Sequence, residues 1–342
     1  MDKNSNINIQ QVELCVTSRC NLKYLHCYQD EEKNIYEIPL YKIDEIISFL
    51  GDEDCRSVIF SGGEFFMHGS AYEILYLALD KTRAKITVQT NGTIIQPDKI
   101  RSFDKKRIGF SVSIDGFEKD HDIRRGAGSY KRTFGNSKEL ISNGFHVSAL
   151  VTLDKRNQPY LPELIDYLFR FFPRVTLLCI ANTGAAHREK NELGLDEEFL
   201  SNTVSLVYRQ ITPRTMNKRR CRVFPESISI KYDGTVFPCS VARDMNLFPM
   251  GNVDKTNLPS ILNKFCFSEI GMSLLNYTSP EEIGECSVCP KNEMCNRGCR
   301  IRAYKWNDDI KTPDPFACKV YMGKFECKNI SDVFWGVKNL EV

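Results

Sequence analysis

The sequence lacks the features that direct a protein to a membrane or to nucleic acid. It contains no run of about 18 apolar residues, the length that a helix needs to cross a bilayer. Its 46 Lys and Arg residues nearly balance its 44 Asp and Glu residues, and the net charge of +2 gives no broad attraction to nucleic acid or anionic lipid. The first residues, Met1–Gln11, are polar and lack the apolar core of a signal peptide. We therefore expect a cytoplasmic protein that binds neither nucleic acid nor membranes.

Cysteine, in contrast, is abundant. The chain has 14 cysteines in 342 residues, and four of them lie between Cys286 and Cys299. Disulfides are rare in proteins that are not exported, so ligation of a metal or a cluster explains these cysteines better.

The first half of the chain alternates between short apolar stretches, typical of buried strands, and stretches with helical periodicity. We predict strands at 12–17, 57–61, 85–90, 108–114, 146–152 and 175–180, and helices at 40–50, 71–79, 130–143 and 161–172. Such alternation indicates an α/β fold with a parallel sheet, whose ligands bind at the carboxyl ends of the strands. The pattern leaves open an incomplete barrel of six units or a doubly wound sheet.

The second half has a different character. Residues 181–217 predict a loop and one helix at 196–210, and Ser227–Cys239 predicts a β-hairpin with an Asp233-Gly234 turn. Short irregular segments are expected after it, with too few apolar residues for a large core and with metal sites as the stabilising element. The predicted divisions are 1–190, a helical bridge at 191–217, a cysteine-rich domain at 218–330 and a tail at 331–342.

The segment Thr17–Tyr28 contains the spacing Cys20-x3-Tyr24-x2-Cys27. It resembles the C-x3-C-x2-C signature of radical S-adenosylmethionine (SAM) enzymes, with Tyr24 at the middle cysteine. The resemblance implies a partial (β/α)6 barrel and a [4Fe–4S] cluster on three thiolates, whose fourth iron binds SAM and drives release of a 5′-deoxyadenosyl radical. Cys20, Tyr24 and Cys27 are the candidate ligands, although a phenolate is harder and bulkier than a thiolate.

Further motifs match the SAM-binding positions of that family. Gly62-Gly63-Glu64 follows a predicted strand and resembles the GGE motif that contacts the SAM amino group. Asn91 and Ser113 lie in strand-end segments that line the SAM and substrate cavity in relatives. Arg125, in an HDxxRG pattern, would meet the SAM carboxylate. Without the resemblance, the strand-end motifs are explained as turns and Arg125 as a solvated loop arginine.

The carboxyl-terminal cysteines resemble the SPASM extension of radical SAM enzymes, which holds two auxiliary [4Fe–4S] clusters. The resemblance assigns four cysteines to the outer cluster: Cys286, Cys289, Cys295 and Cys318. It assigns three to the inner cluster: Cys221, Cys239 and Cys299. The alternative is a structural zinc site, because paired cysteine spacings also bind zinc.

Proteins with this two-part layout mostly modify peptides or proteins, and the resemblance predicts such a substrate and a reductant such as a flavodoxin or ferredoxin. An anaerobic sulfatase-maturase is a weaker alternative, because Ser240 stands where that type carries an aspartate. The chain starts close to its first strand, so we expect no amino-terminal peptide-recognition domain. Tyr24 leaves three interpretations open. In the first, the SAM cluster forms with a non-thiolate third ligand and the protein is an enzyme. In the second, the protein is an inactivated variant of an active enzyme, and in the third it is a non-catalytic iron–sulfur binding or electron-transfer partner with a defective SAM cluster.

Overall fold

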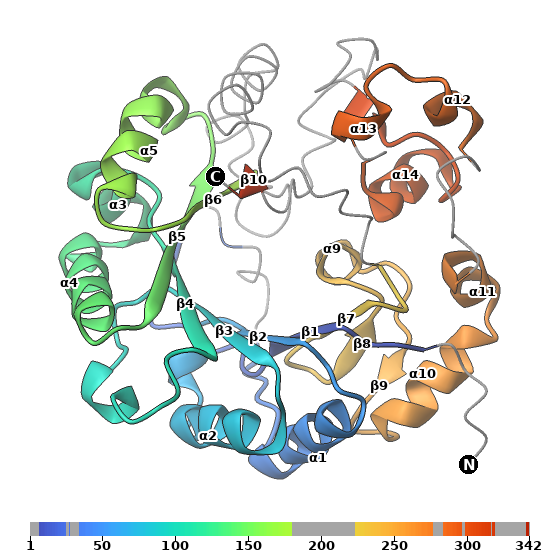
Figure 1. The fold of residues 1–342 in the computed structure, drawn as a ribbon, viewed down its shortest axis with the longest axis horizontal. Helices are drawn as coiled ribbons and strands as arrows, with labels where there is room; N and C mark the ends of the chain where they lie inside the picture. Colours follow the sequence, from blue (N-terminus) through green and yellow to red (C-terminus); the bar gives the residue numbers. More distant parts are fainter. Residues whose placement is uncertain are drawn as a thin grey trace.

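The computed structural model describes residues 7–24, 27, 34–179, 223–275, 283–295, 298–315, 317–318 and 340–341. The strands in these ranges form a single sheet with the order β10-β6-β5-β4-β3-β2-β1-β7-β8-β9 (Figure 1). The sheet therefore joins both halves of the sequence and does not close on itself.

Six parallel strands form the larger part of the sheet. They are β1 (Gln11–Cys15), β2 (Ser57–Ser61), β3 (Lys85–Thr90), β4 (Ile108–Ser113), β5 (His146–Leu153) and β6 (Val175–Cys179). Each strand pairs in parallel with the next one along the chain. A doubly wound sheet would reverse its strand order at a switch point. The unbroken order confirms the predicted α/β fold as a partial barrel.

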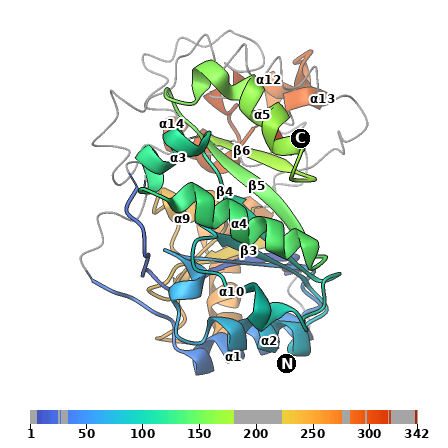
Figure 2. The same ribbon diagram turned by 90° about the vertical axis from the view of Figure 1, so that its left-hand side faces the viewer.

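Helices cover the outer face of this curved sheet, and Figure 1 shows them along its convex side. They are α1 (Leu40–Asp52), α2 (Ala71–Lys81), α3 (Glu118–Arg125), α4 (Ser129–Ser142) and α5 (Leu161–Phe169), with 3₁₀ turns at Phe65–Met67, Pro97–Ile100 and Gln158–Tyr160. Figure 2, turned by 90°, shows α4 lying in front of the middle strands. Four of the five helices match the predicted ranges closely.

Helix α3 was not predicted, because its sequence has a single apolar side chain. Its first turn is acidic and its last turn is basic, which suits the helix dipole. It buries His121, Arg124 and Arg125 in place of an apolar stripe. Polar contacts rather than hydrophobic periodicity therefore hold this helix on the sheet.

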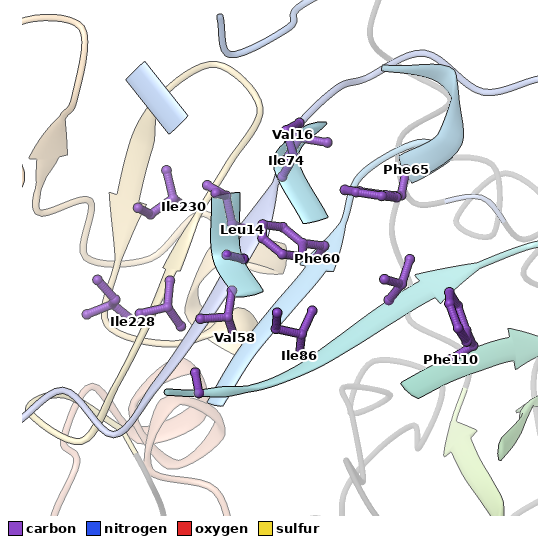
Figure 3. Packing of buried hydrophobic residues seen from close by; sticks show 14 of the residues in the cluster. Leu14, Val16, Val58, Phe60, Phe65, Ile74, Ile86, Phe110, Ile228 and Ile230 are labelled. Atoms are coloured by element: carbon purple, nitrogen blue, oxygen red, sulfur yellow. The ribbon is translucent and has the colours of Figure 1, made fainter. Parts of the chain in front are cut away.

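The core lies between the sheet and these helices. Alternate residues of β1, β2 and β3, such as Leu14, Phe60 and Ile86, point to this side and are buried (Figure 3). Ile228 and Ile230 of the carboxyl-terminal half belong to the same cluster. The barrel and the hairpin that follows residue 222 therefore share one core.

The predicted hairpin is confirmed. It consists of β7 (Ser227–Ile230) and β8 (Thr235–Phe237), which pair antiparallel, and Gly234 in the turn has a φ of 82°. Strand β7 also pairs in parallel with β1, and the short strand β9 (Gly251–Asn252) pairs with β8. At the other end of the sheet, β10 (Leu340–Glu341) pairs antiparallel with β6.

The segments after the hairpin are more regular than expected. They contain α9 (Ser240–Asp244), α10 (Leu258–Cys266), α11 (Glu269–Leu275), α12 (Gly284–Ser287), α13 (Asn292–Cys295) and α14 (Arg300–Asn307). The prediction of irregular structure was wrong for α10. Asn257 accepts a cap hydrogen bond from the Ser260 amide, and Pro259 lies in the first turn, which are both recognisable start signals. The predicted helix at 196–210 lies outside the described residues.

Among the residues that the structure describes, no helix is both long enough and apolar enough to cross a bilayer.

A buried ion pair connects β1 with the segment after the hairpin. Arg243 of α9 donates through Nη1 to Glu13 Oε1 at 2.7 Å, to Cys15 Sγ at 2.9 Å and to Ser229 Oγ at 3.0 Å. Both charged side chains are buried, and Ser61 Oγ also donates to Glu13 Oε1. Burial and the nearby carboxylate of Glu13 contribute to raising the pKa of the Cys15 thiol to about 11, so it stays protonated.

We predict that Arg243→Ala lowers the free energy of unfolding by about 3–5 kcal/mol, because it leaves Glu13 buried without its cation. Urea denaturation of the anaerobically purified protein measures the change. The control is Arg101→Ala, which removes an exposed pair with Asp98 and should cost less than about 1 kcal/mol. Similar losses in the two variants would contradict this role of Arg243.

Candidate functional site

The carboxyl ends of the parallel strands bring together several of the predicted site residues. The loop after β1 carries Cys20 and Tyr24, the end of β2 leads into Glu64, and Asn91 follows β3. Arg125 reaches the same edge from the last turn of α3. Residues that are distant in the sequence thus meet at the edge where ligands of parallel sheets bind.

Two glycines allow the loop after β1 to lie against the end of β2. A Cβ atom on Gly62 would lie 2.5 Å from the Thr17 carbonyl oxygen, and one on Gly63 would lie 2.2 Å from the Arg19 carbonyl oxygen. The amides of Gly63 and Glu64 donate to these same carbonyls at 2.7 Å. The glycines are therefore required by the approach of the chain's own backbone.

Glu64 is almost fully buried, and its carboxylate accepts three hydrogen bonds within the barrel. Oε1 accepts from Thr90 Oγ1 at 2.6 Å and from the Phe66 amide at 3.2 Å, and Oε2 accepts from the Asn91 amide at 2.7 Å. Burial raises the pKa of Glu64, and these donors oppose the shift. The carboxylate thus joins the ends of β2 and β3.

Asn91 and Asn21 extend this network into the cysteine loop. Asn91 Nδ2 donates to Asn21 Oδ1, and Asn21 Nδ2 donates to Thr93 Oγ1, both at 2.9 Å. Asn21 lies directly after Cys20, so these bonds fix the start of the loop relative to β3. The sequence analysis did not identify Asn21, because a lone asparagine gives no signal of such a contact.

Arg125 is buried and paired, which excludes the alternative of a solvated loop arginine. Its Nε donates to Asp115 Oδ2 at 2.5 Å, and the other oxygen of Asp115 accepts from the Thr152 amide at 2.8 Å. The Arg125 guanidinium lies 4.5 Å from the centre of the Tyr24 ring. Asp115 therefore fixes a cation against the ring of Tyr24, and its role was not predicted from the Asp115-Gly116 turn.

The loop itself offers two thiols and a phenol. Tyr24 Oη lies 3.6 Å from Cys20 Sγ, and the Cys27 amide donates to the Tyr24 carbonyl at 3.3 Å. Burial raises the pKa of Tyr24 well above its usual value, although Arg125 opposes the shift, and burial also raises the pKa of Cys20. A tyrosine oxygen is a harder and bulkier donor than a thiolate, so Cys20, Tyr24 and Cys27 do not fit a cluster that requires three thiolates.

The inner face of the sheet carries short polar side chains beside this loop. Ser111 and Ser113 of β4 are partly exposed, whereas Phe110 and Val112 point to the buried side. In the sheet register, Ser111 is the partner of Gln89 on one side and of Ser148 on the other. Ser113 thus belongs to a polar, partly exposed strip at the carboxyl edge.

Four carboxyl-terminal cysteines are the predicted ligands of the outer cluster. Cys286 lies in α12, Cys289 follows it, and Cys295 ends α13. Burial and the charges of Cys295, Cys286 and Cys289, in that order, raise the pKa of Cys318 to about 12. Among the residues that the structure describes, no three His, Cys, Asp or Glu side chains are grouped closely enough to hold a metal ion. Four thiols are nevertheless the donor type that iron–sulfur clusters use, so the assignment of these cysteines to one cluster, which would supply one-electron transfer, stays a prediction.

Asp314 contacts the two segments that contain Cys299 and Cys318. Its Oδ2 accepts from the Cys299 amide at 2.7 Å and from Arg302 Nη2 at 2.5 Å, and its carbonyl accepts from the Cys318 amide at 3.0 Å. Gly298 has a φ of 69°, and a Cβ there would lie 2.4 Å from Asp314 Cβ. Asp314 therefore contacts Cys299 through its buried carboxylate and Cys318 through its main-chain carbonyl.

The cysteines expected for the inner cluster are described only in part. Cys239 precedes α9 and its Sγ accepts from the Ala242 amide at 3.4 Å, while Cys299 precedes α14. Cys221 lies outside the described residues. The grouping of these three thiols therefore stays a prediction.

Two family models match the chain. The radical SAM superfamily matches residues 14–168, and the iron–sulfur cluster-binding domain SPASM matches residues 221–290. The chain therefore contains a radical SAM domain followed by a SPASM domain. These domains imply [4Fe–4S] clusters and SAM as cofactors.

Curated relatives include enzymes of peptide and protein maturation. The chain is 29% identical to the antilisterial bacteriocin subtilosin biosynthesis protein AlbA of Bacillus subtilis, over 85% of this chain and 67% of AlbA. It is 23% identical to a cysteine-type anaerobic sulfatase-maturating enzyme of Clostridium novyi, over 95% of this chain and 96% of that protein.

Solved structures support the same fold. Streptococcus suis SuiB bound to S-adenosylmethionine aligns with a TM-score of 0.67 at 14% identity, over 92% of this chain and 78% of SuiB. Native anSMEcpe with bound AdoMet and a Cp18Cys peptide aligns with a TM-score of 0.68 at 17% identity, over 91% of this chain and 94% of anSMEcpe. At these identities the likeness establishes the fold alone.

His121 provides a pH-dependent test of the buried polar network. Its Nδ1 accepts from the Asp115 amide at 3.3 Å, and among the described residues its buried Nε2 has no hydrogen-bond partner. Burial and the charge of Arg125 lower the pKa of His121 to about 4. In the unfolded chain His121 binds a proton near pH 6.5, whereas in the folded protein it stays neutral until about pH 4. The free energy of unfolding is therefore unaffected by His121 above pH 6.5 and decreases as the pH falls from 6.5 toward 4.

We predict that the wild type loses about 2 kcal/mol more stability between pH 7 and pH 5 than His121→Asn, which keeps an acceptor but does not titrate. Urea unfolding at the two pH values measures the difference. Equal losses in the two proteins would contradict the neutral, buried state of His121.

Proposed function

We propose that this chain is a cytoplasmic radical SAM–SPASM protein of the maturase type, which binds a peptide or protein substrate. The proposal places the substrate along the inner face of the partial barrel and SAM near its carboxyl edge. The SPASM domain would hold auxiliary [4Fe–4S] clusters and exchange electrons with a carrier such as a flavodoxin or ferredoxin.

The inner face of the sheet is the observation that carries this proposal. It presents the partly exposed Gln89 and Ser111 side by side, with Ser113 two residues further along β4, and Ser111 Oγ lies 2.9 Å from Oγ of the buried Ser148. Short hydroxyl and amide side chains leave room beside a sheet and can bond to the polar groups of a peptide backbone.

The names of several relatives support a peptide substrate. AlbA is a bacteriocin biosynthesis protein, SuiB has been solved bound to the precursor peptide SuiA, and anSMEcpe has been solved with AdoMet and peptides. These names concern the other proteins, and they agree with a peptide as the substrate class of this chain. Ser240 argues against the sulfatase-maturase type, because a serine cannot act as the base that the resemblance implies.

A second candidate is an enzyme that modifies its peptide through a 5′-deoxyadenosyl radical. The retained arrangement of Asn91, Ser113 and Arg125 at the carboxyl edge favours it. The mismatch of Tyr24 with a three-thiolate site opposes it, so we rank binding without turnover first.

The auxiliary cluster is tested by cysteine substitution. We predict that Cys318→Ser lowers the iron content of anaerobically reconstituted protein by about four atoms per chain, because it removes one ligand of a [4Fe–4S] cluster. Iron and sulfide analysis measures the change. The matched control is Cys266→Ser in the buried core, which should leave the iron content unchanged. Zinc in place of iron, or no difference between the variants, would contradict the assignment.

The substrate class is tested with a displayed library of random peptides. We predict that peptides selected on the wild type lose at least tenfold in affinity for Ser111→Trp, because an indole fills the inner face, and bind Ser142→Trp on the exposed end of α4 unchanged. Fluorescence anisotropy measures both affinities, and circular dichroism checks that the variants are folded. Failure to enrich any peptide, or equal affinity for the two variants, would contradict the proposal.

A further inference from the structure

The side chain of Tyr24 extends into the place where the radical SAM signature requires a metal-bound sulfur. A tyrosine side chain is several bonds longer than a cysteine side chain, so its oxygen cannot occupy the position of the missing sulfur while the backbone keeps its course. Hydrogen bonds hold the described chain on both sides of Tyr24, because Asn21 bonds to Asn91 and Thr93 and the Cys27 amide bonds to the Tyr24 carbonyl. The ring lies beside Cys20 and against the Arg125 guanidinium.

The contacts of the Tyr24 hydroxyl and of the Tyr24 ring support this interpretation. Its hydroxyl lies 3.6 Å from Cys20 Sγ, so the phenol is directed at one of the two thiols expected to bind iron. The Arg125 guanidinium covers the ring at 4.5 Å. A cation over a tyrosine face is attractive, by about 0.5–2 kcal/mol depending on solvation.

Asp115 fixes the cation in this position independently of Tyr24. It binds Arg125 Nε through Oδ2 and the Thr152 amide through Oδ1, and it is fully buried. Arg125 therefore comes to the ring from a rigid part of the barrel. The cationic side chain and the aromatic ring thus lie together beside Cys20, one of the two remaining thiols.

We propose that the first site of this chain holds no [4Fe–4S] cluster, and that the stack of Tyr24 and Arg125 takes its place. The chain then acts by binding its substrate rather than by reductive cleavage of SAM, while the SPASM domain keeps its own clusters. This inference rests on the proposed function, whose auxiliary cluster and peptide site are tested by other variants.

The first experiment removes the two remaining thiols. Anaerobically reconstituted Cys20→Ser/Cys27→Ser should contain the same iron as the wild type, with the same visible absorption and the same electron paramagnetic resonance signals after reduction. A loss of about four irons per chain would overturn the inference. This comparison does not depend on any variant gaining a function.

The second experiment distinguishes a filled site from a site with phenolate ligation. Tyr24→Phe keeps the ring and its stack with Arg125 but removes the oxygen. Its iron content and spectra should equal those of the wild type. A loss of iron in Tyr24→Phe would show that the phenol is a ligand and would overturn the inference.

The third experiment restores the missing ligand. Tyr24→Cys should gain about four irons per chain and should form 5′-deoxyadenosine from SAM and dithionite, which the wild type should not. The gain should be absent from Tyr24→Cys/Cys20→Ser and from Tyr41→Cys, an exposed tyrosine on α1. Release of 5′-deoxyadenosine by the wild type would overturn the inference.

These outcomes are separable from failure of the proposed function. The iron lost in Cys318→Ser reports on the auxiliary cluster alone, and peptide affinity reports on the inner face of the barrel. Both proposals would be supported if the wild type contains auxiliary iron, binds peptides and has an iron content that does not depend on Cys20 and Cys27. A wild type without auxiliary iron would contradict the proposed function and leave the comparison at Cys20 and Cys27 valid.

Discussion

The pairing of β1 on both of its edges is the constraint on which the rest of the structure depends. A partial barrel leaves β1 with an unpaired edge, and an open edge invites pairing with another chain. Here β7 covers that edge in parallel, and the pair of Arg243 with Glu13 fixes α9 against the same strand. Because the Arg243 amide bonds to the Cys239 carbonyl, the residues that close the edge also set the position of Cys239 relative to the barrel. The contacts that cover the edge of β1 therefore also set the position of a candidate cluster ligand.

The carboxyl edge of the barrel is organised by carboxylates with several donors each, and two of them, Glu64 and Asp115, are buried. Glu64 joins β2 to β3, Asp115 joins α3 to β5, and Asp122 accepts from the amides of Gly128 and Tyr130 at the start of α4. Such groups are costly to bury without partners and rigid when fully paired. The framework around the ligand edge is thus assembled from polar contacts that need no ligand to be satisfied. This explains how the edge can keep its shape whatever occupies the neighbouring cysteine loop.

The sequence predicts the sheet better than it predicts the site. Strands β2 and β3 have the predicted bounds, because apolar runs that end in Gly62 or Asn91 carry local signals of period and turn. Helix α3 was missed because its stability comes from polar contacts, of Arg124 with Thr152 in the distant strand β5 and of Arg125 with Asp115 just after β4. The joining of β7 to β1 was missed for the same reason, since strand pairing across 200 residues leaves no local pattern. The contact of Tyr24 with Arg125 likewise exists only in the folded chain.

The retained motif residues require a different interpretation once their contacts are known. Gly62 and Gly63 are needed for the close approach of Thr17 and Arg19, and Glu64 is needed to join two strands. Their presence therefore follows from the requirements of folding and does not by itself demonstrate that SAM is cleaved. Tyr24, in contrast, contacts Cys20 and Arg125 at the ligand edge, where a three-thiolate site would require a cysteine. A barrel whose shape is independent of its first cluster can lose that cluster and still present its inner face and its SPASM domain to a substrate.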